Sequence, residues 1–182
     1  MYSKARIAGH PIHPMLIAFP VAMYVATVVT LLVHVATNGV FWYEVARYAS
    51  VAGVVTAGIA AIPGLIDLLN LPSRSRARAT GFKHAAFNVL ALVLFAVCAV
   101  LLWRESVFTA DVTAPLVLSI AGALSTVAAG WLGWTLVQTH HVGVKPSQFG
   151  RDIEPENVDD LDELAPRMPS TYHETYRTTI RH

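Results

Sequence analysis

Ionisable side chains that can bind metals stand at the ends of four long apolar segments. Imidazole nitrogens are ligands of haem iron and of transition metals, and a carboxylate can orient the imidazole that binds. Ionisable residues are costly inside a membrane, so they are candidates for functional sites. They precede the first segment, end the second, begin the third and end the fourth: His10 and His13, Asp67, His84, and His140 with His141.

Helical spacing indicates which of these side chains share a face. Asn88 follows His84 by four residues, so the two are expected side by side on one helix. His141 shares a face with Trp134, whereas His140, about 100° further round, is expected to point away. The polar ends of the four segments are expected to line one pocket, and His84 and His141 are the pair predicted to face each other across it.

Three hypotheses follow from this cluster. The first is a membrane redox module that holds one b-type haem and transfers electrons within a larger complex, because facing histidines in a four-helix bundle can ligate haem iron. Its cofactor-binding residues would be His84 and His141 as axial ligands, with Asp67, His13, His10 and Asn88 around them. The second is a non-haem zinc or iron ion held by His13, His84 and His141 with Asp67. The third is a structural cluster in an accessory subunit of a membrane complex.

Other chemistries find little support in the chain. No phosphate-binding loop, nucleophile elbow, HExxH pair or dinucleotide fingerprint occurs, so no catalytic residue is assigned. His34 stands alone near the opposite end of its segment, which argues against a second haem. The single cysteine, Cys98, excludes an internal disulfide framework and a CxxC site.

Composition indicates that membrane-spanning helices position these residues. The chain has 182 residues, of which 54% are hydrophobic and only 14% charged, and its net charge of +1 offers no basic surface for nucleic acid. Long uncharged runs approach or exceed the ~20 residues that a helix needs to cross a bilayer. The sequence therefore predicts an all-α, transmembrane four-helix bundle in contact with lipid. The expected helices cover residues 14–38, 41–70, 82–104 and 113–141.

Lysine and arginine positions predict the orientation of the bundle. Eight of these residues flank one side of the predicted spans and two, Arg47 and Arg104, flank the other. The positive-inside rule then places both termini in the cytoplasm, and the histidine cluster near the cytoplasmic side of a prokaryotic inner membrane. Pro20 and Pro63 lie inside the predicted helices and are expected to bend them.

The chain divides into two parts by composition. Residues 1–144 form the predicted membrane domain, and residues 145–182 form a polar, acidic cytoplasmic tail that is too polar to build a core of its own. The tail is a candidate contact for a membrane-protein partner or redox complex. Small residues four apart in the fourth segment, namely Gly122, Thr126 and Gly130, favour close helix packing, with a homo-oligomer interface as the alternative.

One set of motifs resembles a known family. The opening Gly9-His10-Pro11-Ile12-His13-Pro14, the Gly64-Leu65-Ile66-Asp67 end of the second segment, Lys83-His84-Ala85 and His141-Val142-Gly143-Val144 are similar to DUF2231, a prokaryotic family of predicted membrane proteins. The resemblance covers about residues 9–144 and implies a four-helix membrane architecture. Some relatives look like fusions to a Rieske iron–sulfur domain, whereas the tail of this chain has no cysteine to carry such a cluster.

Overall fold

The structure, a computed structural model, describes residues 4–8, 10–104, 111–140 and 142. His141 and the polar tail therefore lie outside the described residues. A short antiparallel hairpin comes first and consists of β1 (Arg6–Ile7) and β2 (His10–Pro11). Five helices follow: α1 (Ile12–Leu16), α2 (Ala18–Thr37), α3 (Val40–Leu69), α4 (Arg76–Arg104) and α5 (Thr113–Gln138).

Four helical segments are long and apolar enough to span a membrane. These segments are α1 with α2, then α3, α4 and α5, and each contains a window of high mean hydropathy with few charges. The all-α, four-helix prediction is thus confirmed. The orientation of the bundle in the membrane stays a prediction.

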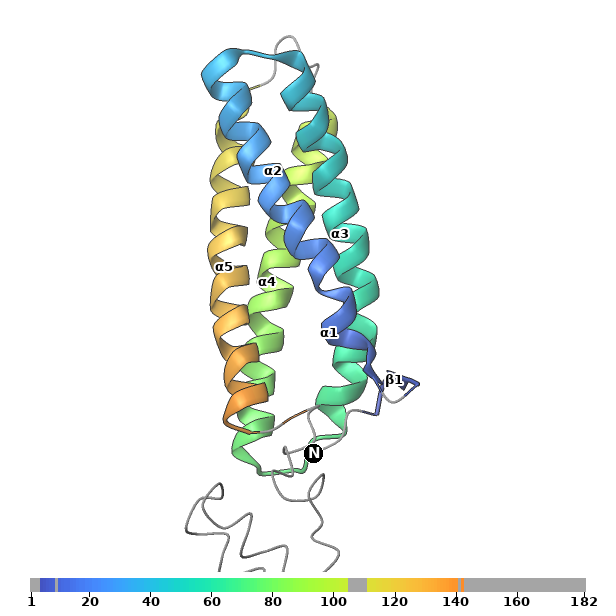
Figure 1. Ribbon diagram of the computed structural model, residues 1–182. Coiled ribbons are helices and arrows are strands. Elements are labelled where there is room, and N and C mark those ends of the chain that lie inside the picture. The colour runs from blue at the N-terminus through green and yellow to red at the C-terminus, as the bar shows by residue number, and fades with distance from the viewer. Residues whose placement is uncertain (1–3, 9, 105–110, 141, 143–182) are drawn as a thin grey trace, which may run out of the picture. The chain divides into compact units, whose positions relative to one another are not determined.

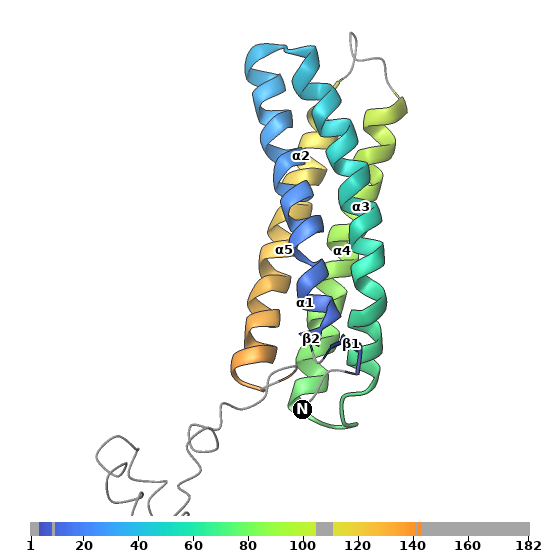
Figure 2. The same cartoon turned by 45° about the vertical axis from the view of Figure 1, so that its right-hand side comes forward.

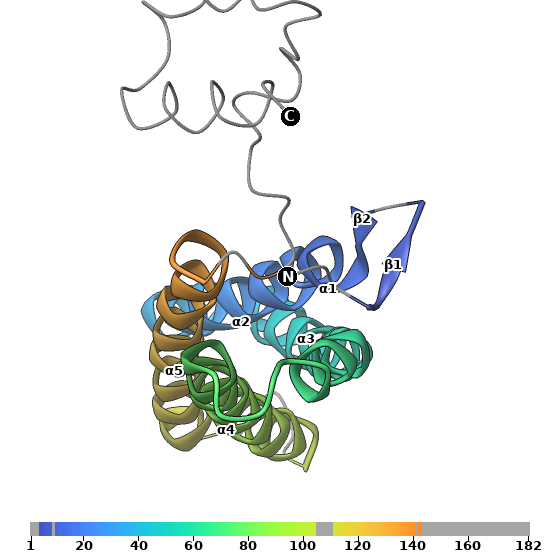
Figure 3. The same ribbon diagram turned by 90° about the horizontal axis from the view of Figure 1, so that it is seen from below.

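The helices form a ring in which each contacts its two neighbours (Figures 1 and 3). α2 packs mainly on α3 and α4 mainly on α5, so the bundle consists of two helical hairpins. The β1–β2 hairpin and the α3–α4 connection lie at one end of the bundle, the lower end in Figures 1 and 2. At this end α1 and α4 begin and α3 and α5 finish, which brings the polar ends of all four spans into one layer.

The second hairpin begins earlier than its hydropathy indicates, because α4 starts at Arg76 rather than at residue 82. Ser75 explains the start: its hydroxyl accepts the backbone N–H of Arg78 at 3.1 Å, as a helix N-cap does. The Arg78 guanidinium then donates to the carbonyl of Leu71 at 3.0 Å and ties the first turn to the preceding connection. The charged first turns thus extend the helix beyond the apolar run that predicts the span.

The first span is divided near its start. α1 and α2 are separated by a turn at Ile17, three residues before Pro20. Pro20 has no N–H to donate to the carbonyl of Leu16, so the helical ladder loses a bond at this point. α3, by contrast, continues as one helix through Pro63.

The two hairpins are related by an internal repeat. The pattern Ser-x2-Gly-x6-Ala-x3-Gly occurs at Ser50–Gly64 in α3 and again at Ser119–Gly133 in α5. The serines, the first glycines and the alanines of both copies are buried. Residues 71 positions apart correspond in the other two spans and are buried in the same way, namely Tyr24 with Phe95, Thr27 with Cys98 and Leu31 with Leu102.

The repeat places equivalent side chains face to face in the core. The Tyr24 and Phe95 rings stack with centroids 3.7 Å apart and planes inclined by 3°. A Cβ at Gly53 would approach the Tyr24 ring to 2.7 Å, and one at Gly122 would approach the Phe95 ring to 2.7 Å. Each glycine thus admits the aromatic ring of the helix before it, and the two rings meet between the hairpins.

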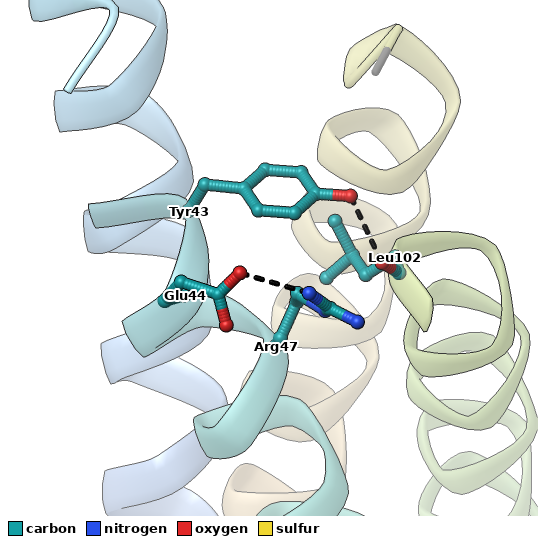
Figure 4. Close-up of polar contacts among 4 residues, drawn as sticks. All are labelled: Tyr43, Glu44, Arg47 and Leu102. Carbon is teal, nitrogen blue, oxygen red and sulfur yellow. Dashed lines mark hydrogen bonds and ion pairs between the residues drawn. The ribbon is translucent and has the colours of Figure 1, made fainter. Parts of the chain in front are cut away.

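The opposite end of the bundle is closed by polar and aromatic contacts (Figure 4). The buried Tyr43 hydroxyl donates to the carbonyl of Leu102 at 2.9 Å and so joins α3 to α4. The Arg47 guanidinium donates to Glu44 at 2.8 Å and lies 4.3 Å from the centre of the Trp103 ring. These contacts hold the two helical hairpins together at the end opposite His13 and His84.

Candidate functional site

His13 is fixed against the neighbouring helix of its own hairpin. Its Nδ1 lies 2.8 Å from the carbonyl oxygen of Ala60 in α3. Because a carbonyl only accepts hydrogen bonds, Nδ1 must carry a hydrogen, and in the neutral imidazole Nε2 then keeps its lone pair. Gly64 permits this approach, since a Cβ there would lie 2.9 Å from the His13 ring.

His84 repeats this arrangement in the second hairpin. Its Nδ1 donates to the carbonyl oxygen of Ala129 in α5 at 2.8 Å. Gly133 faces the ring, and a Cβ there would lie 3.2 Å from His84 Cε1. His84 follows His13 by 71 residues, and Ala129 and Gly133 each follow their counterparts by 69, so the repeat supplies both histidine sites.

The two imidazoles lie close together between the hairpins. Their ring centroids are 6.2 Å apart and their planes are inclined by 88°. Two imidazoles that bind one ion, each through a nitrogen about 2 Å from it, would have to lie about this close together. The two rings thus form a close pair that joins the two helical hairpins.

Asn88 contacts the second ring nitrogen of His84, Nε2. Its side-chain nitrogen lies 3.0 Å from His84 Nε2 and also donates to the His84 carbonyl at 2.9 Å. The amide N–H can donate to Nε2 only if that atom is unprotonated, which agrees with the tautomer set by Ala129. The predicted shared face of His84 and Asn88 is thus a direct contact.

Asp67 and His10 form hydrogen bonds with the backbone of the N-terminal segment. Asp67 Oδ1 accepts the backbone N–H groups of Lys4 at 2.8 Å and Ala5 at 3.1 Å, so α3 holds the chain just before the β-hairpin. His10 is exposed, and its Nδ1 lies 3.0 Å from the carbonyl oxygen of Ala8. These contacts fix the segment that leads into His13.

The expectation that His140 points away from the bundle was wrong. His140 is half-buried, and its Nε2 lies 3.4 Å from the hydroxyl of Thr80 in α4. The cause is the end of α5, where His140 N–H reaches back to the carbonyl of Thr135 and the regular helical phase no longer applies. The predicted pairing of His84 with His141 stays untested, and the described histidine beside His84 is His13.

The donor set in the described part of the chain is small. No group of three or more histidine, cysteine, aspartate or glutamate side chains there could hold a metal ion. Two imidazoles are nevertheless sufficient for haem, because the porphyrin supplies the other four ligands of a six-coordinate iron. His34 lies apart, with Nδ1 3.1 Å from the carbonyl of Gly39 and its ring 5.3 Å from that of Tyr43.

A family model for a predicted membrane protein, DUF2231, matches residues 9–146. The chain belongs to the DUF2231 family. The matched region contains both histidines, their carbonyl acceptors and both glycines, so the whole site lies within the DUF2231 part of the chain. No curated protein and no solved structure matches the chain.

The acceptors that fix the two rings could not be predicted from side-chain patterns. The carbonyls of Ala60 and Ala129 carry no side-chain signal, and the contact of Thr80 with His140 depends on how α5 ends. The repeated pattern around Gly64 and Gly133 was the available signal. Two glycines in equivalent positions, one helix after each histidine, indicate that something must approach both helices closely.

Proposed function

We propose that this DUF2231 protein is a membrane redox module that holds one b-type haem between His13 and His84. The observation that carries the proposal is the pair of imidazoles with centroids 6.2 Å apart, each anchored through Nδ1 to a carbonyl of the next helix. The anchors leave Nε2 of both rings as the candidate iron-binding atoms, and the outer hydrogen bonds would fix ring orientation. The Asn88 amide, which lies 3.0 Å from His84 Nε2, would have to turn away from that atom for iron to bind there. Bound haem would carry one electron between its ferric and ferrous states.

The architecture supports a single haem rather than two. The internal repeat provides one histidine from each hairpin, and the two meet in one layer at the same end of the bundle. Such cofactor sites lie between facing helices of four-helix bundles. One haem at one end cannot carry electrons across the membrane alone, so a redox partner in a larger complex is part of the proposal, and positive charge near this end favours the cytoplasmic side of a prokaryotic inner membrane.

A non-haem zinc or iron ion is the second candidate for the same pair. It would need at least one further ligand beside His13 and His84, because structural and catalytic zinc sites use three or four protein ligands. His141 is the residue that sequence proximity offers. A purely structural pair, in an accessory subunit, is the third candidate, since each imidazole also joins two helices.

Absorption spectra of the purified full chain test the proposal. We expect a Soret band and a sharp α-band in the reduced protein, both lost in His13→Ala and in His84→Ala. His34→Ala is the matched control, because it replaces a histidine at the other end of the bundle, and it should keep the spectrum. Bound metal without haem absorbance would support the non-haem metal site. If the purified protein contains neither metal nor haem, the structural pair is the remaining candidate.

A further inference from the structure

Thr80 and His140 form a polar pair between the histidine site and the nearby end of the bundle, a position called here the mouth of the site. Thr80 precedes His84 by four residues, so it lies about one helical turn, or about 6 Å, nearer the end of the bundle on the same face of α4. His140 reaches it from the end of α5, with Nε2 3.4 Å from the Thr80 hydroxyl. Asn88 lies one turn on the other side of His84, further from this end, and is exposed.

This pair has no counterpart in the other hairpin. In the sequence, Gly9 corresponds to Thr80 by the 71-residue offset, and Leu71 corresponds to His140 by the 69-residue offset. The two hairpins are therefore equivalent at the imidazoles but different at the mouth. A ligand with one polar edge could bind there in a single orientation.

From this asymmetry we infer that Thr80 and His140 bind the propionate carboxylates of the haem and so set its orientation; the inference rests on the proposed function. Both side chains can donate to an anionic oxygen, and hydrogen bonds to a charged acceptor are about twice as strong as neutral ones. Their present bond of 3.4 Å is long for a hydrogen bond, so little is lost when each turns to a carboxylate. Arg76 and Lys83 are exposed on the same turns of α4 and add positive charge.

Titration of the haem-free full chain with haemin and with haemin dimethyl ester tests the inference. The ester keeps the iron and the macrocycle but has no carboxylate. We expect the wild type to bind haemin at least about tenfold more tightly than the ester, because a hydrogen bond to a charged group contributes about 1.5–3 kcal/mol. In Thr80→Val/His140→Leu, haemin binding should weaken about tenfold while ester binding stays unchanged.

Two further variants separate carboxylate binding from folding. Thr80→Ser keeps the hydroxyl and Thr139→Val changes a neighbouring exposed threonine, so both should bind like the wild type. Equal affinity of the wild type for haemin and ester would overturn the inference, as would a double variant that weakens both pigments equally. If neither pigment gives the absorption spectrum of a haem ligated by two imidazoles, the proposed function itself would be overturned.

Discussion

Gly64→Ala tests the packing of the His13 site directly. A Cβ at residue 64 would lie 2.9 Å from both Cε1 and Nδ1 of His13. Carbon contacts are most favourable at about 3.5–4.0 Å, so the ring must retreat by about 0.6 Å or more. This movement lengthens and weakens the 2.8 Å hydrogen bond from Nδ1 to the Ala60 carbonyl. A partly buried donor without a partner costs about 1–3 kcal/mol.

Gly58→Ala is the matched control in the same helix. A Cβ at residue 58 has nothing within 4 Å. Both substitutions share the helix-propensity gain of about 0.8–1.0 kcal/mol, which cancels when the two variants are compared. Gly64→Ala should therefore be less stable than Gly58→Ala by about 1–3 kcal/mol in reversible unfolding in detergent.

The second hairpin gives an independent measurement of the same effect. Gly133 faces His84 at 3.2 Å, and Gly130 has open space around its Cβ position. Gly133→Ala should lose less stability than Gly64→Ala, because the ring has to yield by only a few tenths of an ångström. Equal stabilities of Gly64→Ala and Gly58→Ala would refute the view that these glycines exist to admit the histidines.

Further predictions concern the core and the topology. Tyr43→Phe should destabilise the bundle by about 1 kcal/mol in the same unfolding assay, because it removes the hydrogen bond to Leu102. Tyr24→Phe should not, since the Tyr24 hydroxyl is buried without a hydrogen-bond partner among the described residues, and a loss equal to that of Tyr43→Phe would contradict this. In a Cys98-free chain, a cysteine in place of Ser75 should be protected from an impermeant reagent in intact cells, and one in place of Thr109 should react. The opposite labelling pattern would reverse the proposed orientation.

The sequence predicted the spans well because bilayer thickness limits them. Four apolar runs, with charges between them, leave few other folds for this chain. The boundaries were less certain because polar residues can continue a helix outside the apolar run. Ser75 and Arg78 extend α4 in this way, through a cap and a bond to the preceding connection.

The site was predictable as a layer but not as a set of contacts. Chain direction alone places His13, Asp67 and His84 at one end of the bundle. Which rings face each other depends on how far each helix is rotated about its axis, and this rotation follows from close packing at Gly64 and Gly133. Apolar runs that face lipid on one side and protein on the other carry little of this information.

The spin state of the iron in ligand-deletion variants tests the central claim most directly. Ferric haem with two axial imidazoles is low-spin, and removal of one ligand leaves a high-spin iron with an open position. We predict that His13→Gly and His84→Gly are each high-spin by electron paramagnetic resonance and that added imidazole restores the low-spin signal in both. A low-spin signal in both variants without imidazole would contradict the account, because another residue would then hold the iron.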